Sequence, residues 1–395
     1  MAWYKHIKKI GFIISLLLFL YLINPYNLNM YFGYILVALT LTKKQVLLKN
    51  LDANFTLLLV FSIIYALFYA LDPIGGNQYV FVYALFPSAF YLLGKYIYEQ
   101  LGGKIMVLFY FLFILGTLFS LTSLISVLLN ILEGGFGQLD RSLPLFWNGQ
   151  VVPATLMGSY FILNMCIPAL LVVRQEKSNL LFKIIAIVIY LLSLACVLRL
   201  GSRTQIVISL IALFGSLLYI IPRQSMKRNM ITFIVFFVGI SFLISNVSFD
   251  LNQDWLSTFA GRMEKGGASD IASGGGRVER WGKSFEKMFT HPFGWDADEF
   301  GHSHNLWLDV LRVSGIIPFI FLVAFSIRSF FNVKAAVRNN RERQTFNNLL
   351  IAYFVAFFLV FMVEPIFEGI FELFAIFCLF MGIVNKYRTT QPLNP

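Results

Sequence analysis

The apolar residues of this chain gather in long uninterrupted runs instead of alternating with polar ones. A helix needs about 20 apolar residues to cross roughly 30 Å of hydrocarbon, and the runs are of this order. The period-two alternation typical of barrel strands is absent. We therefore predict an all-α, polytopic membrane protein with about 12 transmembrane helices. The predicted spans are 8–24, 28–42, 53–71, 79–94, 105–129, 151–173, 180–198, 205–221, 230–247, 305–327, 346–363 and 370–385.

Composition supports this class. Of the 395 residues, 58% are apolar and only 13% are charged, whereas soluble domains carry about 25% charged residues. The three cysteines, Cys166, Cys196 and Cys378, lie inside apolar runs and share no metal-type spacing. We predict that they pack in the core and form neither disulfides nor metal sites.

The positive charges indicate an orientation. Lys5, Lys8 and Lys9 precede the first run, and no small-residue cleavage site follows it, so we predict an uncleaved first helix. With both termini in the cytoplasm, 21 of the 31 lysines and arginines fall in cytoplasmic connections, as the positive-inside rule requires. The net charge of +11 is then mainly a topology signal, and nucleic acid is excluded as a partner. The resulting organisation is one integrated membrane domain: helices 1–9 in 1–247, a long outer connection in 248–304 that contains short helices, and helices 10–12 in 305–395.

Ten cations remain on the outer side, and most of them lie in or beside two connections, 199–204 and 248–304. Arg199 and Arg203 flank the short connection between helices 7 and 8, and Arg203 is predicted to open helix 8. An arginine near hydrocarbon is costly and marks a function or a partner, and guanidinium matches phosphate through its bidentate fork. Alternatively, both side chains snorkel to lipid headgroups.

The long outer connection contains a predicted amphipathic helix. We interpret Gly274 to Gly276 as a flexible hinge and not as a nucleotide-binding loop, because no Gly-Lys-Ser/Thr follows. After them, apolar residues recur at three- and four-residue steps with charges, Arg280 among them, between them. We predict a helix that starts at Arg277, ends at His291-Pro292 and lies on the membrane surface.

The segment after this helix concentrates ionisable side chains. His302 and His304 precede the tenth predicted span, with Ser303 or Asn305 as its cap. Asp309 follows on this span, three residues before Arg312, and the two could pair. We interpret His304 as a catalytic or substrate-binding residue. A metal site is the competing interpretation, with ligands among Asp296, Asp298, Glu299, His302 and His304, although the spacing matches no metal motif.

Three glutamates connect the last two spans. Glu364, Glu368 and Glu372 recur at steps of four and would share one face if the segment were helical. They could orient an acceptor hydroxyl, pair with the arginines or only mark helix ends.

Four sequence elements together resemble a known family. They are the Ser-Arg-Thr at the start of a helix, the Gly-Arg before a Trp-containing helix, HPFGW, and HSHNLWLDVLRVSGI. In this order they resemble the bacterial O-antigen ligase/polymerase family, over roughly residues 195–330. The first half of the chain is similar to the family only in hydropathy.

The resemblance implies a membrane glycosyltransferase that acts without metal or other cofactor on glycans carried by undecaprenyl diphosphate. The active site would face the periplasm, at the bacterial cytoplasmic membrane. Arg203, Arg277 and His304 match the family's motif residues, and His302 matches a histidine of some members. Polymerases extend a lipid-linked repeat unit, whereas ligases transfer the polymer to lipid A-core. The segment between HPFG and HSHN is short here, which favours the polymerase over the ligase.

The chemistry of the residues fits this activity. Arg203 and Arg277, with Arg199 and Arg280, would hold the diphosphate, and His304 would orient or deprotonate the acceptor hydroxyl. Direct displacement would invert the anomeric centre. The remaining substrate-binding candidates are His302, Asp309, Arg312 and Glu368. The partners would be the lipid-linked oligosaccharide, the acceptor glycan, the bilayer and a chain-length regulator.

A lipid-linked glycan flippase or another transporter is the alternative from a different class. Such proteins usually contain two related halves and polar residues at mid-membrane. This sequence has no convincing internal repeat, and its unusual charges gather at the outer face.

Overall fold

The computed structural model describes residues 2–73, 75–138, 140–173, 180–246 and 276–389, and most of these residues are helical. The chain forms two compact units. Unit 1 comprises 1–119, 272–342 and 361–395, and unit 2 comprises 120–271 and 343–360. The predicted hinge at Gly274 and Gly275, and the rest of the long outer connection up to residue 275, lie outside the described residues.

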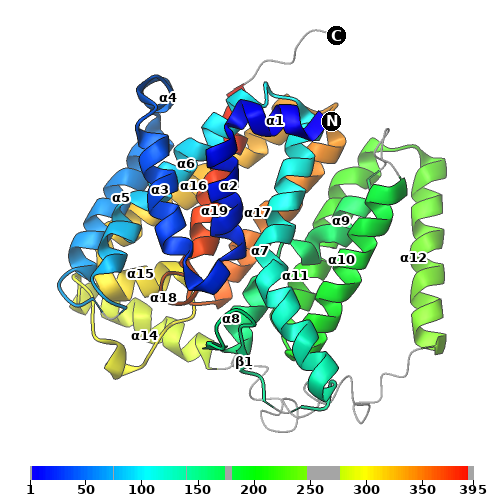
Figure 1. The fold of residues 1–395 in the computed structure, drawn as a ribbon. Helices are drawn as coiled ribbons and strands as arrows, with labels where there is room; N and C mark the ends of the chain where they lie inside the picture. Colours follow the sequence, from blue (N-terminus) through cyan, green and yellow to red (C-terminus); the bar gives the residue numbers. More distant parts are fainter. Residues whose placement is uncertain (1, 74, 139, 174–179, 247–275, 390–395) are drawn as a thin grey trace. The chain divides into compact units, whose positions relative to one another are not determined.

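Unit 1 contains the N-terminal helices, α14 to α16 and the C-terminal helices (Figure 1). Its elements are α1 (Ala2–Ile10), α2 (Phe12–Ile23), η1 (Pro25–Asn27), α3 (Asn29–Leu41), α4 (Lys44–Asn50), α5 (Ala53–Tyr69), α6 (Gln78–Gln100), the first half of α7 (Ile105–Gly134), α14 (Arg277–Thr290), η5 (Ala297–Glu299), α15 (Leu306–Ser314), α16 (Ile316–Asn339), α18 (Ile366–Gly369) and α19 (Phe371–Thr389).

The core of unit 1 is the pair α6 and α19, flanked by α5 and α16. Two glycines bring the backbones of α6 and α19 together. A Cβ at Gly94 would lie 1.9 Å from the Leu379 carbonyl oxygen, and one at Gly382 would lie 2.0 Å from the Tyr91 carbonyl oxygen. Small residues allow such close packing of helices in membranes. At one end of this unit lie α1 and α4, and at the other lie α14, α15 and α18 (Figure 1).

Unit 2 contains the second half of α7 and most of the helices up to α12. Its elements are β1 (Leu143–Pro144), β2 (Val151–Val152), α8 (Ala154–Ser159), η2 (Asn164–Cys166), α9 (Ile167–Leu171), α10 (Leu180–Arg199), α11 (Arg203–Ile220), η3 (Ile221–Arg223), α12 (Met226–Asn246) and most of α17 (Gln344–Val363). The two short strands pair antiparallel. Met157, Phe161, Cys196 and Leu200 form part of the buried core of this unit.

Six helices of the described residues are long and apolar enough to cross a membrane. They are Gln78–Gln100, Ile105–Gly134, Leu180–Arg199, Arg203–Arg223, Ile316–Asn339 and Gln344–Val363. The first three predicted spans form the shorter apolar helices α2, α3 and α5. The fold is therefore that of a helical membrane protein, and the number of twelve spans stays a prediction.

Two predicted spans are not single helices. Residues 151–173 form β2, α8, η2 and α9, because Pro153 and Pro168 each lack the N–H that a continuous helix would use. Residues 305–327 divide into α15 and α16 at Gly315, whose φ of 75° lies in the left-handed region. The three cysteines are free and buried, as predicted.

Candidate functional site

The site candidates fall into both units. Arg199 and Arg203 belong to unit 2, and the other seven belong to unit 1. Arg203 is the first residue of α11, which confirms that it opens a helix. The Arg199 side chain is fully buried; its Nε donates to Asn130 Oδ1 at 2.9 Å and its Nη2 donates to the Asp140 carbonyl at 3.0 Å. Arg199 therefore braces the segment after α7 within unit 2 and does not snorkel.

In unit 1, the predicted amphipathic helix is confirmed as α14. It starts at Arg277 after Gly276, whose φ is 79°, and ends before His291. One face of α14 packs on α15 through Trp281, Met288 and the buried Ser284. Val278, Phe285 and Phe289 form a neighbouring stripe that stays exposed.

The helix α14 holds the turn that carries the two histidines. Arg280 Nη1 donates to the His302 carbonyl at 3.0 Å, and Trp281 Nε1 donates to the Ser303 carbonyl at 2.9 Å. The hydroxyl oxygens of Ser284 and Ser303 lie 2.7 Å apart. The sequence pointed to Ser303 only as a possible cap and not to Ser284, because a serine pair that joins separate segments leaves no periodic signal.

Asp309 fixes this turn from the other side. Its Oδ1 accepts the Ser303 N–H at 2.7 Å, and its Oδ2 accepts the Asn305 N–H at 3.1 Å. His304 lies between these two anchored amides with φ 52°. A residue with a Cβ seldom adopts this left-handed region, and a surrounding structure that holds it there marks functional sites. Asn305 caps α15 by accepting the Trp307 and Leu308 N–H groups, as predicted.

Asp309 and Arg312, which the spacing would allow to pair, each bind other partners, although the Arg312 charge still acts on the Asp309 carboxyl. Arg312 Nη2 binds Glu368 Oε1, and His302 Nδ1 binds the other oxygen of the same carboxylate. The Arg312 Nη2 and His302 Nδ1 atoms are 3.5 Å apart. Glu368 thus bridges a histidine and an arginine that come from a distant part of the sequence.

The three glutamates do not share one helix. Pro365 and Ile370 interrupt it, so that Glu364 follows α17, Glu368 lies in α18 and Glu372 lies in α19. Glu364 is buried and lies 3.8 Å from Arg277 Nη2, while Glu372 accepts from Asn29. Pairing with arginines was one of the predicted alternatives, and it holds for Glu364 and Glu368.

Aromatic side chains keep α18 in place. The Tyr83 hydroxyl donates to the Phe367 carbonyl at 2.8 Å. The Phe367 ring lies 4.8 Å from that of Tyr65 and 5.8 Å from that of Phe61, measured between centroids. The neighbouring Glu368 is therefore presented to the histidines from a rigid support.

The two histidines differ in their electrostatic environment. Burial lowers the pKa of His304 to about 4, together with the positive charges of Arg277 and Arg280, so its imidazole is neutral at pH 7. The hydrogen bond to Glu368 raises the pKa of His302 more than burial lowers it. Burial raises the pKa of Glu368, but His302 and Arg312 outweigh this and the net shift is downward. The His304 Nδ1 atom is buried and has no hydrogen-bond partner among the described residues.

Two carboxylates of the acidic loop after α14 bind groups close to them in the sequence. Glu299 binds Lys287, and Asp296 Oδ1 accepts the Asp298 N–H at 3.0 Å. Among the described residues no group of three or more His, Cys, Asp or Glu side chains has the geometry of a metal site.

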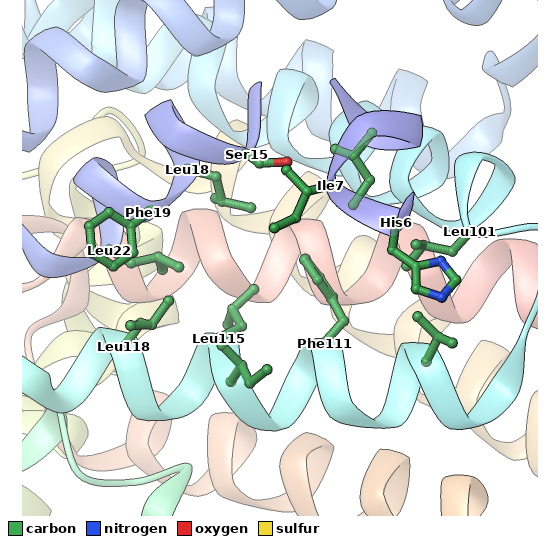
Figure 2. A pocket seen from close by; sticks show the side chains of 13 residues that line it. His6, Ile7, Ser15, Leu18, Phe19, Leu22, Leu101, Phe111, Leu115 and Leu118 are labelled. Carbon is green, nitrogen blue, oxygen red and sulfur yellow. The ribbon is translucent and has the colours of Figure 1, made fainter. Parts of the chain in front are cut away.

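An almost wholly apolar pocket of about 210 Å³ lies between α1, α2 and α7 in unit 1 (Figure 2). Leu18, Leu22, Phe111 and Leu115 are among its lining residues, and the His6 ring is at one side. Such a pocket favours a hydrocarbon ligand and has few polar groups that could take part in catalysis.

No protein-family model matches the chain, and no curated protein matches it. Fold and site thus define a class only: a helical membrane protein with a charged, histidine-containing cluster at one end of a helical unit.

Proposed function

We propose that this protein is a membrane glycosyltransferase that joins glycan units carried on undecaprenyl diphosphate, most simply a polymerase of O-antigen or a related surface polysaccharide. The alternative within the same class is a ligase that transfers the polymer to lipid A-core. The observation that carries the proposal is His304: a neutral imidazole with an unpartnered, buried Nδ1, held in a left-handed backbone beside two arginines.

The reaction follows from these groups. The acceptor hydroxyl gives its proton to the neutral His304 imidazole, and its oxygen bonds to the anomeric carbon of the donor. The bond from that carbon to the diphosphate oxygen breaks, and the electron pair leaves with the diphosphate. Arg277 and Arg280 stabilise this negative charge. Among the described residues the Arg280 guanidinium donates one hydrogen bond, to the His302 carbonyl, so its other N–H groups can reach an anion.

A pKa of about 4 makes His304 a weak base in the free protein. A bound diphosphate offsets the positive charges of Arg277 and Arg280, and removal of this repulsion raises the pKa of His304 toward the working pH. The base thus becomes effective when the donor is present. The hydrogen bond to Glu368 raises the pKa of His302 and so favours its protonated form, which can donate a hydrogen bond to a sugar oxygen.

The test is glycosyl transfer by the purified protein in lipid nanodiscs, with the lipid-linked glycan as substrate and mass spectrometry to detect new glycosidic bonds. His304→Ala and Arg277→Ala should abolish transfer at normal protein levels, and Arg277→Lys should be impaired because lysine lacks the fork. Arg203→Ala tests the sequence prediction for unit 2. The Glu279→Gln variant, at an exposed residue of α14, is the control. If the three alanine variants transferred glycan like the wild type, the site assignment would be wrong.

Two further results separate the alternatives. After deletion of the gene, a single repeat unit on the lipid core indicates a lost polymerase, whereas polymer that remains on the carrier indicates a lost ligase. Glycan translocation by the purified protein without new glycosidic bonds would instead favour the transporter.

A further inference from the structure

Beside the histidine cluster, unit 1 contains a pocket of about 260 Å³ that the proposed chemistry does not use. Its walls come from the end of α5, the segment after α14 and the end of α15. We name it the Asp72–Asp296 pocket. Its lining includes Phe68, Asp72, Phe293, Trp295, Asp296 and Arg312.

Two glycines allow close backbone packing at this pocket, and one of them, Gly294, lines it. Trp295 N–H donates to the Arg312 carbonyl, and Ile316 N–H donates to the Pro292 carbonyl, both at 2.9 Å. A Cβ at Gly294 would lie 2.3 Å from the Arg312 carbonyl oxygen, and one at Gly315 would lie 2.1 Å from the Pro292 carbonyl oxygen. Both glycines have positive φ, 104° and 75°. The HPFGW segment is therefore fixed, backbone against backbone, on the break between α15 and α16.

The side chains give the pocket an apolar wall and a polar rim. The rings of Phe68 and Phe293 are stacked, with centroids 6.3 Å apart and planes inclined by 18°, and Phe293 is 70% exposed. Asp72 and Asp296 are both exposed. Trp295 is 8% and Arg312 is 2% exposed, and Trp295 Nε1 and Arg312 Nε have no hydrogen-bond partner among the described residues.

These features point to a particular ligand chemistry. Aromatic faces with a few convergent polar groups are typical of small-molecule sites, and 260 Å³ is just below the range of about 300–1,000 Å³ for larger ligands. Carboxylates accept hydrogen bonds from hydroxyl or ammonium groups and repel anions. The positive charge of Arg312 is already matched by Glu368, so the pocket favours a neutral or amino-bearing polyol over an acidic one.

We propose that the Asp72–Asp296 pocket is a saccharide subsite that holds one neutral or amino sugar ring and excludes acidic sugars and the diphosphate. Arg312 lines this pocket and also contacts Glu368 and lies near His302, so the ring would be next to the proposed catalytic histidines. The diphosphate would lie on the side of Arg277 and Arg280. The assignment of the ring to the transferred glycan rests on the proposed function; the binding itself does not.

The experiment measures binding and transfer on the same full-length protein in nanodiscs. Saturation-transfer NMR is recorded with methyl glucoside, methyl galactoside, glucosamine and glucuronic acid as probes. We expect binding of the neutral or amino sugars and at least about tenfold weaker binding of glucuronic acid. The double variant Asp72→Asn/Asp296→Asn should weaken binding by about tenfold or more. Asparagine keeps the cap that Asp296 provides to Asp298.

Asp298→Asn is the matched control, because it removes the same charge from the same loop at an exposed residue that does not line the pocket. The double variant should raise the KM of transfer with little change in kcat, and Asp298→Asn should leave both unchanged. The proposal is overturned if no probe binds, if glucuronic acid binds as well as the neutral sugars, or if both variants bind like the wild type. Wild-type binding without any transfer would refute the proposed function and leave the subsite standing.

Discussion

Substitution of His304 by asparagine separates a catalytic histidine from a structural one. A left-handed backbone costs a residue with a Cβ about 1–2 kcal/mol, and asparagine tolerates it better because its short side chain bonds locally. The His304 Nδ1 has no hydrogen-bond partner among the described residues, so its removal breaks no hydrogen bond there. We therefore expect His304→Asn to leave the free energy of unfolding unchanged or to raise it by up to about 1 kcal/mol.

The same substitution removes the only group that we assign as the base. General-base catalysis contributes about 10²- to 10⁴-fold, so transfer should fall by that factor. Thermal unfolding of both proteins in the same nanodiscs gives the stability, and initial rates of transfer give the activity. Ser303→Ala is the control, because it loses the contact to Ser284 next to His304 but keeps the imidazole. A variant that unfolds at a lower temperature and still transfers glycan like the wild type would refute the reasoning, since His304 would then be structural.

Four further predictions concern His304 and the elements around it. Asp309→Asn keeps one acceptor for the two flanking amides and loses the other. Burial raises the pKa of Asp309 to about 7, so the lost hydrogen bond is only partly to a charged group and contributes about 1–2 kcal/mol, and kcat/KM should fall about 5- to 30-fold. The acid limb of the pH profile of kcat/KM should also shift; an unchanged profile would exclude a positioning role. In the wild type, kcat/KM should be lost as the pH falls through about 4, the pKa of His304 in the free protein. The acid limb of kcat should lie at higher pH, because the bound diphosphate raises the pKa of His304. If the two limbs coincided, this effect of the diphosphate would be contradicted. The pKa of His302 is higher in the folded protein than its unfolded value of about 6.5, so protonation of His302 stabilises the fold. This contribution to the free energy of unfolding is complete at pH values below about 6.5 and is lost as the pH rises through the folded pKa. Gly294→Ala should destabilise the protein by at least about 1–3 kcal/mol through backbone strain, whereas Gly282→Ala, within α14 and with open space around it, should not; equal unfolding temperatures would disprove the close packing.

The exposed apolar stripe of α14 is predicted to lie on the membrane surface, and this can be tested. Val278, Phe285 and Phe289 are exposed and are expected to contact the membrane surface. A spin label at residue 289 should be shielded from a water-soluble relaxation agent in nanodiscs, whereas a label at the exposed Glu279 should not. Equal accessibility of the two labels would argue against an interfacial helix.

Local patterns in the sequence were enough for the helices whose signals are local. The apolar runs predict α10, α11 and α17 because a helix in hydrocarbon must satisfy its own backbone groups. The apolar period predicts α14 with both ends, and Asn305 is identifiable as a cap from its place before an apolar segment. The gathering of His302, His304, Asp309 and Arg312 is visible in the sequence because these residues are close together along the chain.

Only the tertiary structure decided which of these groups interact. The sequence pairs Asp309 with Arg312 by helical spacing, but burial leaves Asp309 to bind two amides and brings Glu368 from a distant segment to Arg312 and His302. Likewise, the predicted span over 305–327 ignores Gly315, where the approach of another backbone requires a left-handed break. Such contacts depend on chain segments that meet only after folding, so hydropathy and periodicity cannot predict them. The sequence thus determined the membrane class and the candidate residues, and packing determined which of these residues contact one another.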